Sequence, residues 1–341
     1  LLAQRQQPEG YWLTAHTTGR AFEQPRPELN TYLNAILLDV AGPVAASVGL
    51  EDRLARARAY LSRQIEEGGL VRYHGRPDEL PKGGLGCAIT PDTDDTALAW
   101  RLAPIEDRGR LRQALATIER FRRPDGLYRT WLAPREQYQC LAPGADPRPA
   151  DIGIQLNLLM LLAEVDPAAA RALCAAVARK LDDDAVWVYY AAAPLMVLLR
   201  LADLGPVGCP LTLPAARLRS HLPDQAVWIE LAEVLHRART GPPTPELQAQ
   251  AVGLLRLLAV GDFALLATAP PLFYHNDLTA SVSRYYWSQD LGYALWLRLQ
   301  VESERRLAQI IDGSAVAMFV IDAEHRVTHW NKACAALTSL P

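Results

Sequence analysis

The sequence predicts an all-α protein whose helices form an α/α toroid, followed by a short α/β segment at the C-terminal end. Three observations support this fold class. Apolar residues recur three and four positions apart through most of the first 300 residues, strand-like alternation is nearly absent before residue 315, and one turn motif repeats at equal intervals. With 341 residues and 50% hydrophobic content, the chain can build one large domain or two ordinary ones.

The helical pattern divides the chain into segments of ordinary helix length. Prolines stand at many of the segment ends, and loops rich in Gly and Pro are expected at 68–91, 142–149, 205–214 and 241–245. We expect helices over 31–40, 54–65, 94–102, 111–121, 152–165, 168–181, 190–201, 226–238, 247–260 and 291–311.

An acid-glycine turn repeats in the first part of the chain. It occurs in residues 6–12, 64–70 and 122–128, and its glycines, Gly10, Gly68 and Gly126, are spaced 58 residues apart. A glycine suits a helix end because it takes positive φ without steric cost. A period of this length accommodates two helices with their connections, which is the unit of a toroid with an inner and an outer ring.

Charge and hydropathy exclude two classes of protein. The 35 Lys+Arg and 38 Asp+Glu residues leave a net charge of −3, so no basic surface for nucleic acid is expected. The longest uncharged apolar stretch, 186–199, ends at Arg200 and is shorter than the ~20 residues of a membrane span. We therefore expect no transmembrane segment, while peripheral membrane contact stays open.

Cysteine usage suggests a reducing environment. The five cysteines are an odd number at wide spacings without a Cys-x-x-Cys pair, so we expect neither a disulfide framework nor a zinc site, and a cytoplasmic location. They are Cys87, Cys140, Cys174, Cys209 and Cys334. The chain opens on Leu1 without a signal-peptide pattern and ends at Pro341 within a pattern, and we interpret it as an excerpt of a longer protein.

Three carboxylates stand at the start of one predicted helix. Asp92, Asp94 and Asp95 lie in the sequence Thr-Pro-Asp-Thr-Asp-Asp-Thr-Ala that begins at Thr90. Such residues are favourable helix caps, because they accept hydrogen bonds from free backbone N–H groups and complement the helix dipole. A cap alone would account for the pattern.

The Asp-x-Asp-Asp-Thr-Ala element, together with the repeat at residues 6–12, resembles the class II terpene cyclases. This group contains the squalene-hopene cyclases and the cyclases that make bicyclic prenyl diphosphates. The resemblance implies an α6/α6 barrel of the terpenoid cyclase/prenyltransferase type over residues 1–300. It also implies isomerase activity, in which the terminal alkene of a linear isoprenoid such as farnesyl or geranylgeranyl diphosphate is protonated and cyclised through carbocations.

In that family the middle aspartate of the motif is the general acid, which corresponds to Asp94, with Asp92 and Asp95 positioning and polarising it. Alkenes are very weak bases, so the acid must stay protonated near neutral pH. Neighbouring carboxylates favour this because they cannot all ionise together. The carbocations that follow need aromatic faces and exclusion of water.

Candidate substrate-binding residues come from two aromatic clusters and their neighbours, although aromatic runs at helix starts commonly pack between layers. They are Trp187, Tyr190, His275, Arg284, Tyr285, Tyr286 and Trp287. A diphosphate substrate would call for arginines, Arg284 or Arg129, and would bring Mg²⁺ with it, whereas we predict no metal site made by the protein. His16, His74 and His275 are candidates to support the acid by hydrogen bonding.

The last forty residues follow a different pattern. After the helix at 291–311, strands are expected near 316–322 and 326–330, and a helix begins near Asn331. This order resembles the beginning of a PAS domain, and we divide the chain into a barrel at 1–300 and a connecting helix with the start of a PAS domain at 301–341. The resemblance implies sensing or dimerisation.

The sequence is therefore compatible with two alternative functions. The first is a class II terpene cyclase with an apolar isoprenoid substrate. The second is a sensor without catalytic activity, whose barrel binds an isoprenoid or other apolar ligand and whose C-terminal helix relays occupancy to the PAS module. An α/α-barrel glycosidase is least favoured, because no second paired acid is identifiable at a suitable position.

Overall fold

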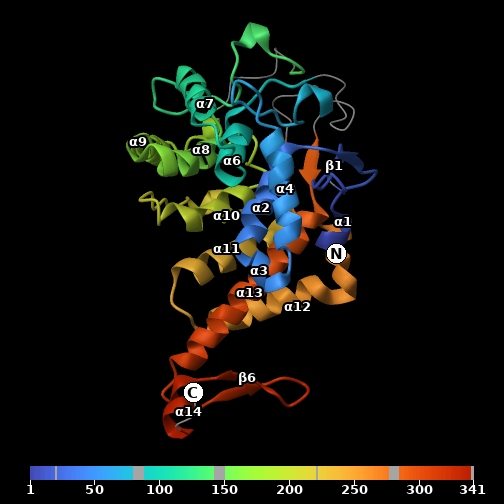
Figure 1. Cartoon of the computed structure of the whole chain (residues 1–341), viewed down its shortest axis with the longest axis vertical. Helices are drawn as coiled ribbons and strands as arrows, with labels where there is room; N and C mark the ends of the chain where they lie inside the picture. Colours follow the sequence, from blue (N-terminus) through green and yellow to red (C-terminus); the bar gives the residue numbers. More distant parts are fainter. Residues whose placement is uncertain (20, 80–87, 142–149, 220–221, 276–283, 339–341) are drawn as a thin grey trace.

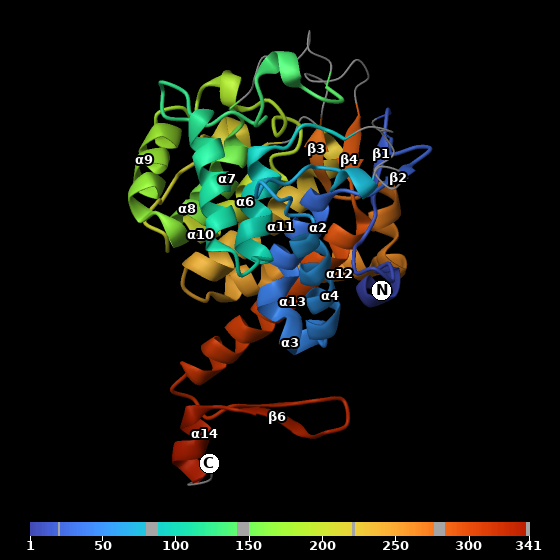
Figure 2. The same ribbon diagram turned by 45° about the horizontal axis from the view of Figure 1, so that its top comes forward.

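In the computed structural model, which describes residues 1–19, 21–79, 88–141, 150–219, 222–275 and 284–338, the longer helices form a closed ring with further helices outside it (Figures 1 and 2). Each ring helix packs against the next, and the last returns to the first. In order, they are α2 (Thr31–Ala41), α6 (Thr93–Leu102), α8 (Ile152–Val165), α10 (Leu195–Leu204), α11 (Ala226–Thr240) and α13 (Gln289–Asp312). The outer helices are α4 (Glu51–Arg63), α7 (Arg108–Arg120), α9 (Pro167–Ala178) and α12 (Pro245–Thr268). The protein is mostly helical, as predicted, and the ring is consistent with a helical toroid.

The difference between ring and outer helices follows from their sequences. α2 and α8 are apolar on nearly every side and are almost completely buried. α4 and α7 carry charged residues on one face and bury the other. Shorter helices are α1 (Leu2–Arg5), α3 (Ala45–Val48) and α14 (Lys332–Thr338), with 3₁₀ turns at Gly42–Val44, Pro77–Glu79, Arg135–Gln137, Asp184–Val186, Ala215–Leu218 and Pro223–Gln225.

Most predicted helices agree with the observed ones to within a few residues, and two differ. α10 begins at Leu195 instead of near residue 190, because Pro194, its N-cap, has no N–H to donate and disfavours helical geometry in the residue before it. α12 extends to Thr268, past a break in helical geometry at Val260–Phe263.

A small sheet accompanies the helices, although strand-like alternation is nearly absent from the sequence before residue 315. β1 (Thr14–Thr17), β2 (Arg26–Glu28), β3 (Leu272–His275) and β4 (Tyr285–Trp287) form an antiparallel sheet in the order β2-β1-β4-β3. Strands of three or four residues are too short to show a periodic pattern. The sheet lies at one end of the ring, and β1 joins the N-terminal region to residues near 286 (Figure 2).

The three repeated turns share one hydrogen-bond pattern. Gln7 N donates to Tyr11 O while Gly10 N donates to Gln7 O, and the same two bonds recur at Glu66–Leu70 and at Arg123–Leu127. The glycine with positive φ in the second turn is Gly69, at +80°, and not Gly68, so the structural spacing departs by one residue from the sequence spacing. Each of these turns packs against an outer helix.

The expectation of no disulfides was wrong. Cys174, on α9, and Cys209, after α10, form a disulfide with Cα atoms 5.8 Å apart, and Cys140 is also disulfide-bonded. Cys334 is free and buried, and Cys87 lies outside the described residues, as does the expected loop at 142–149. Disulfides persist mainly in oxidising environments, so cysteine usage no longer supports a cytoplasmic location.

Two segments are long and apolar enough to cross a membrane by length and composition alone. Residues 31–48 are 61% buried within the ring, and Pro245–Thr268 is 22% buried. Neither segment is an uncharged run, because Asp39 interrupts the first and a few charged residues of α12 interrupt the second. A mostly buried core helix such as α2 meets the same criterion.

The C-terminal segment forms a hairpin and a helix beyond the ring (Figure 1). β5 (Phe319–Ile321) pairs with β6 (Val327–Trp330), and α14 follows. Asn331 is fully buried and connects these elements: its amide donates to Ile311 O and Val316 O, and its Oδ1 accepts from the N–H groups of Met318 and Cys334.

Candidate active site

The three carboxyl groups of the acidic motif gather at the N-terminus of α6. Asp92 is the N-cap, and its Oδ1 accepts a hydrogen bond of 2.8 Å from Asp95 N. The Thr96 hydroxyl donates back to Asp92 O at 2.6 Å, which fixes the first turn of the helix. Asp92 and Asp95 are each 2% exposed, and Asp94, at 8%, is the most accessible of the three.

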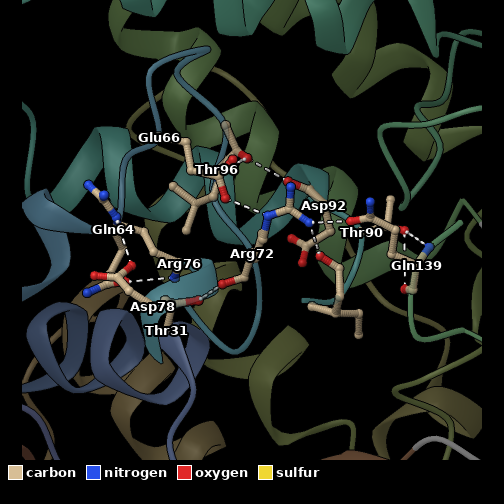
Figure 3. Close-up of polar contacts among 12 residues, drawn as sticks. Thr31, Gln64, Glu66, Arg72, Arg76, Asp78, Thr90, Asp92, Thr96 and Gln139 are labelled. Atoms are coloured by element: carbon tan, nitrogen blue, oxygen red, sulfur yellow. Dashed lines mark hydrogen bonds and ion pairs between the residues drawn. The ribbon is translucent and has the colours of Figure 1, made fainter. Parts of the chain in front are cut away.

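Loops from the two neighbouring repeats hold this helix end in place. Asp92 forms antiparallel bridges with Val71 on one side and with Trp131 on the other. Figure 3 shows how Arg72 ties these loops together: its Nε lies 2.5 Å from Glu66 Oε1, and its Nη1 donates to Gln139 Oε1 at 2.9 Å. The repeated turn at Glu66 is thereby connected to the strand-like segment that carries the acids.

All three carboxyl groups have pKa values above their ordinary range, with burial as the largest cause. The pKa of Asp92 is raised well above 3.8, because repulsion by Asp95 and Asp94 adds to burial. The pKa of Asp95 is raised to about 7 by burial and by the nearby Asp94. Burial also raises the pKa of Asp94, while a hydrogen bond with Asp92 acts in the opposite direction. Their mutual repulsion favours retention of protons at neutral pH.

Thr31, at the start of α2, links the acids to the next loop. Its hydroxyl oxygen lies 2.5 Å from Asp95 Oδ1. The same oxygen lies 2.9 Å from Arg72 O (Figure 3). A hydroxyl has one proton to donate and two lone pairs to accept with. A protonated Asp95 can therefore donate to Thr31 while Thr31 donates to Arg72 O.

A cavity of about 110 Å³ opens directly onto the three acids. Its walls are largely aromatic, and most of the rings come from outside the acidic motif. Besides the acids, it is lined by Tyr32, Tyr73, His74, Ile89, Thr130, Trp131, Cys140, Leu141, Ile154, Tyr189, Tyr190, Tyr274, Arg284 and Tyr286. Such faces can stabilise a cation by their quadrupoles.

The aromatic rings of the cavity are in mutual contact. The Tyr190 hydroxyl donates to the Tyr32 hydroxyl at 2.8 Å, joining α2 to the segment before α10. The ring of Tyr274 lies 4.8 Å from that of Tyr286 and 5.2 Å from that of Tyr189, and Tyr73 approaches the same group at 6.0 Å. These contacts restrain the rings and give the cavity a defined shape.

Of the sequence-predicted binding residues, the structure brings Tyr190, Tyr286 and Arg284 to the cavity. Tyr285 and Trp287 lie on the opposite face of β4, in a separate cluster with Phe22, because successive side chains of a strand point to opposite faces. His275 stacks on Tyr285 at 4.3 Å.

Trp187 also lies outside the cavity lining. It donates to Leu181 O and packs under the Arg217 guanidinium, 5.2 Å from the ring centre. Trp187 therefore has a packing role, which is the alternative to substrate binding that the sequence allowed for aromatic runs at helix starts.

Two titratable groups near the cavity have strongly shifted pKa values. Burial lowers the pKa of His74 to about 4, so its imidazole is neutral at pH 7, and its Nδ1 lies 3.2 Å from Leu29 O. Burial raises the pKa of Glu28 to about 8, and Glu28 lies 3.9 Å from both His74 and His16. The sequence carried no local signal for Glu28, since it follows a loop and belongs to a three-residue strand.

Asp151 and Gly153, at the start of α8, position two of the cavity tyrosines. Asp151 Oδ2 accepts from Val188 N and Tyr189 N at 2.8 Å, and its Oδ1 accepts from Gly153 N. Burial raises the pKa of Asp151 to about 7. Only glycine fits at position 153 without a clash, since a Cβ there would lie 2.3 Å from the Tyr190 ring.

The three acids offer oxygens within 4.8 Å of one another, close enough in distance to hold a cation. Their burial and raised pKa values favour carboxyl groups that retain protons over ionised metal ligands. The chemistry of this donor set is therefore better suited to proton transfer.

Comparison with known proteins finds similarity to a protein family and to a solved structure. Residues 305–341 match the PAS domain family. The chain is also similar to a solved type II terpene cyclase, an arginine-to-alanine variant of MstE from Scytonema in complex with its substrate geranylgeranyl dihydroxybenzoate. The TM-score is 0.45 at 14% identity, over 89% of this chain and 95% of that one. No curated protein sequence matches the chain.

Proposed function

We propose that this chain is a class II terpene cyclase and that its ring of helices is the α6/α6 barrel of such enzymes. The observation that carries the proposal is the trio of buried carboxyl groups with raised pKa values, which opens onto a cavity with aromatic walls. Alkene protonation needs an acid that is still protonated near neutral pH in a site that excludes water.

Asp94 is the proton donor in this proposal, and Asp92 and Asp95 are positioning residues. Asp94 is the most accessible of the three. Its O–H bond breaks as the π electrons of the terminal alkene form a new C–H bond, which leaves a carbocation on the neighbouring carbon. The hydrogen bond with Asp92 and the N-terminus of α6 stabilise the carboxylate that remains.

The carbocation closes rings along the isoprenoid chain and ends by losing a proton to a base, so the reaction is a net isomerisation. His74 is our candidate for the base. Its imidazole is neutral at pH 7, and donation from Nδ1 to Leu29 O leaves Nε2 free to accept a proton. The tyrosine faces of the cavity stabilise the intermediate cations.

The proposed substrate is a linear isoprenoid such as farnesyl or geranylgeranyl diphosphate. Arg284 lines the cavity and is the candidate to hold the diphosphate, which would bring Mg²⁺ with it. The proton-transfer step itself assigns no task to a metal ion.

Incubation of the purified chain with each diphosphate, followed by dephosphorylation and gas chromatography with mass spectrometry, tests the proposal. We expect cyclic products from at least one substrate. Asp94→Asn should lower the rate by at least about 100-fold, because it removes the acid. Asp107→Asn is the matched control: Asp107 caps the outer helix α7, away from the cavity, and should leave the rate unchanged. A folded parent protein that forms no cyclic product from either substrate contradicts the proposal.

A non-catalytic sensor is the second candidate, because α13 runs without interruption from the ring into the segment that matches the PAS domain. Binding of farnesol separates the two. A sensor should bind farnesol equally well in the parent and in Asp94→Asn, and neither should form product.

A further inference from the structure

A second cavity, of about 220 Å³, lies between five of the ring helices, α2, α6, α10, α11 and α13. Four guanidinium groups from different helices line it: Arg101 on α6, Arg200 on α10, Arg239 on α11 and Arg298 on α13. Arg101 follows Asp94 by seven residues, which places it about 10 Å farther along the helix axis. This cavity is thus separate from the acids.

Two aspartates hold these arginines in position. Asp39 bridges two of them, with Oδ1 2.6 Å from Arg101 Nη2 and Oδ2 2.5 Å from Arg200 Nη2. Asp203 Oδ2 lies 3.0 Å from Arg200 Nη1, and its other oxygen pairs with Arg239. The ion pairs therefore fix several guanidinium groups around one space.

The carboxylates around the cavity do not neutralise all of the arginine charge, and they leave some arginine N–H groups without an acceptor. Arg298 Nε lies 3.0 Å from Glu302 Oε1, and one positive charge still remains in excess among these groups. The Arg200 side chain is only 6% exposed, yet its Nε finds no acceptor among the described residues, and neither does Arg101 Nε. Helix C-termini favour nearby cations, but they do not supply acceptors for these atoms. Unpaired buried donors are costly, and an anion in the cavity would supply acceptors.

We infer that this second cavity binds a small phosphate-type oxyanion: inorganic phosphate, diphosphate, or the diphosphate head of an isoprenoid. Guanidinium groups match phosphoryl oxygens with paired N–H donors, and several acceptor oxygens are needed to satisfy donors from several helices. The inference does not depend on Asp94 acting as an acid, because it concerns a different cavity.

Isothermal titration calorimetry of the full chain with sodium diphosphate tests the site. We expect saturable binding that Arg239→Ala weakens by about 10-fold or more, since hydrogen bonds to charged groups contribute about 1.5–3 kcal/mol. Arg305→Ala is the control, because Arg305, on α13, is 47% exposed and lies outside the cavity lining. It should bind like the parent.

Asp203→Asn gives an independent test. Loss of the Asp203 carboxylate frees donors on Arg200 and Arg239 and removes a negative charge from the cavity. Diphosphate should therefore bind several-fold more tightly. A purely structural ion-pair network predicts no such gain, so this variant also decides the question if Arg239→Ala fails to fold. Circular dichroism verifies the fold of each variant.

Competition identifies the source of the anion. If farnesyl diphosphate displaces diphosphate and farnesol does not, the site takes the isoprenoid head; if neither displaces it, the ligand is the free anion. No binding of phosphate or diphosphate to the folded parent, or equal binding by Arg239→Ala, overturns the inference, as does weaker binding by Asp203→Asn. These results are independent of cyclase activity.

Discussion

At the scale of single residues, the fold keeps carboxyl groups in places where ionisation is unfavourable. The pKa of Asp95 is about 7 in the folded protein, against 3.8 for an exposed aspartate, because Asp95 is buried beside Asp94. Because the pKa of such a group differs between the folded and the unfolded protein, the free energy of unfolding depends on pH.

We expect the free energy of unfolding of the parent, relative to Asp95→Asn, to fall as pH rises from about 4 to about 7. In this window the folded protein retains a proton on Asp95 that the unfolded chain has released, so raising the pH favours unfolding. The difference should reach a few kcal/mol, since each unit of pKa shift corresponds to about 1.4 kcal/mol.

Urea unfolding at pH 4, 5.5 and 7 measures this difference. Asp52→Asn is the control, because Asp52 is exposed on α4 and should show no comparable trend. A difference that stays constant across the three pH values would contradict the buried-acid interpretation.

Gly153→Ala should distort the cavity wall. Its new Cβ would lie 2.3 Å from the Tyr190 ring, which is itself 2% exposed and hydrogen-bonded to Tyr32. We expect a loss of about 1–3 kcal/mol in thermal or urea unfolding, the usual cost of overpacking. Gly253→Ala is the control, because Gly253 lies on exposed α12 with open space around it and should be neutral or slightly stabilising. Equal stability of the two variants would contradict the steric argument.

At the scale of elements, the repeated turns connect the ring to its outer helices. Gly10 and Gly69 adopt positive φ, and a Cβ at either would lie 2.6 Å or less from a backbone oxygen, that of Arg56 on α4 or Arg110 on α7. The glycine thus serves both the turn and the close approach of an outer helix.

Adjacent glycines in the second turn allow a sharp test. Gly69→Ala should destabilise the protein by about 2–3 kcal/mol, because it combines positive φ with a backbone clash at 2.5 Å. Gly68→Ala should change stability by less than about 0.5 kcal/mol, since the nearest atom, Gln113 Nε2, is 4.0 Å from its Cβ. Thermal denaturation of both proteins compares them directly, and the reverse order would show that Gly68 is the turn glycine.

Elements were predictable where a pattern extended over many residues. The helical period identified α2, α6, α8 and α11 closely, because each is at least ten residues long and presents nearly three turns or more to the core. The strands of the sheet were not visible, because none exceeds four residues.

The candidate site was predictable only where its residues are contiguous. Asp92, Asp94 and Asp95 share one helix end, so their proximity follows from the sequence. Tyr73 and Tyr274 meet at the cavity from segments about 200 residues apart, and long-range contacts of this kind leave no local pattern. The sequence also did not reveal which face of β4 each aromatic residue occupies, since this depends on the register of a strand it did not predict.

At the scale of the whole molecule, the Cys174–Cys209 disulfide fastens α9 to the segment after α10 across a sequence separation of 35 residues. Replacing both cysteines with serine should lower the free energy of unfolding by about 2–4 kcal/mol, mainly because the unfolded chain gains freedom. Urea unfolding measures the change. Cys334→Ser is the control, because Cys334 is a free thiol in the C-terminal segment and its replacement leaves the ring intact. An unchanged midpoint in the double variant would show that this bond contributes nothing to stability.

The pairing of β1 with β4 determines when the ring can close. Ala15 lies opposite Trp287, and Arg5 pairs with Asp290 at 2.6 Å, so residues from the two ends of the ring complete it together. During synthesis these contacts cannot form until about residue 290 has left the ribosome. Contacts between such distant residues slow folding, and the face of α2 that packs against α13 stays uncovered in the meantime. The nascent chain thus has a long interval in which chaperones could protect it and aggregation could compete with closure.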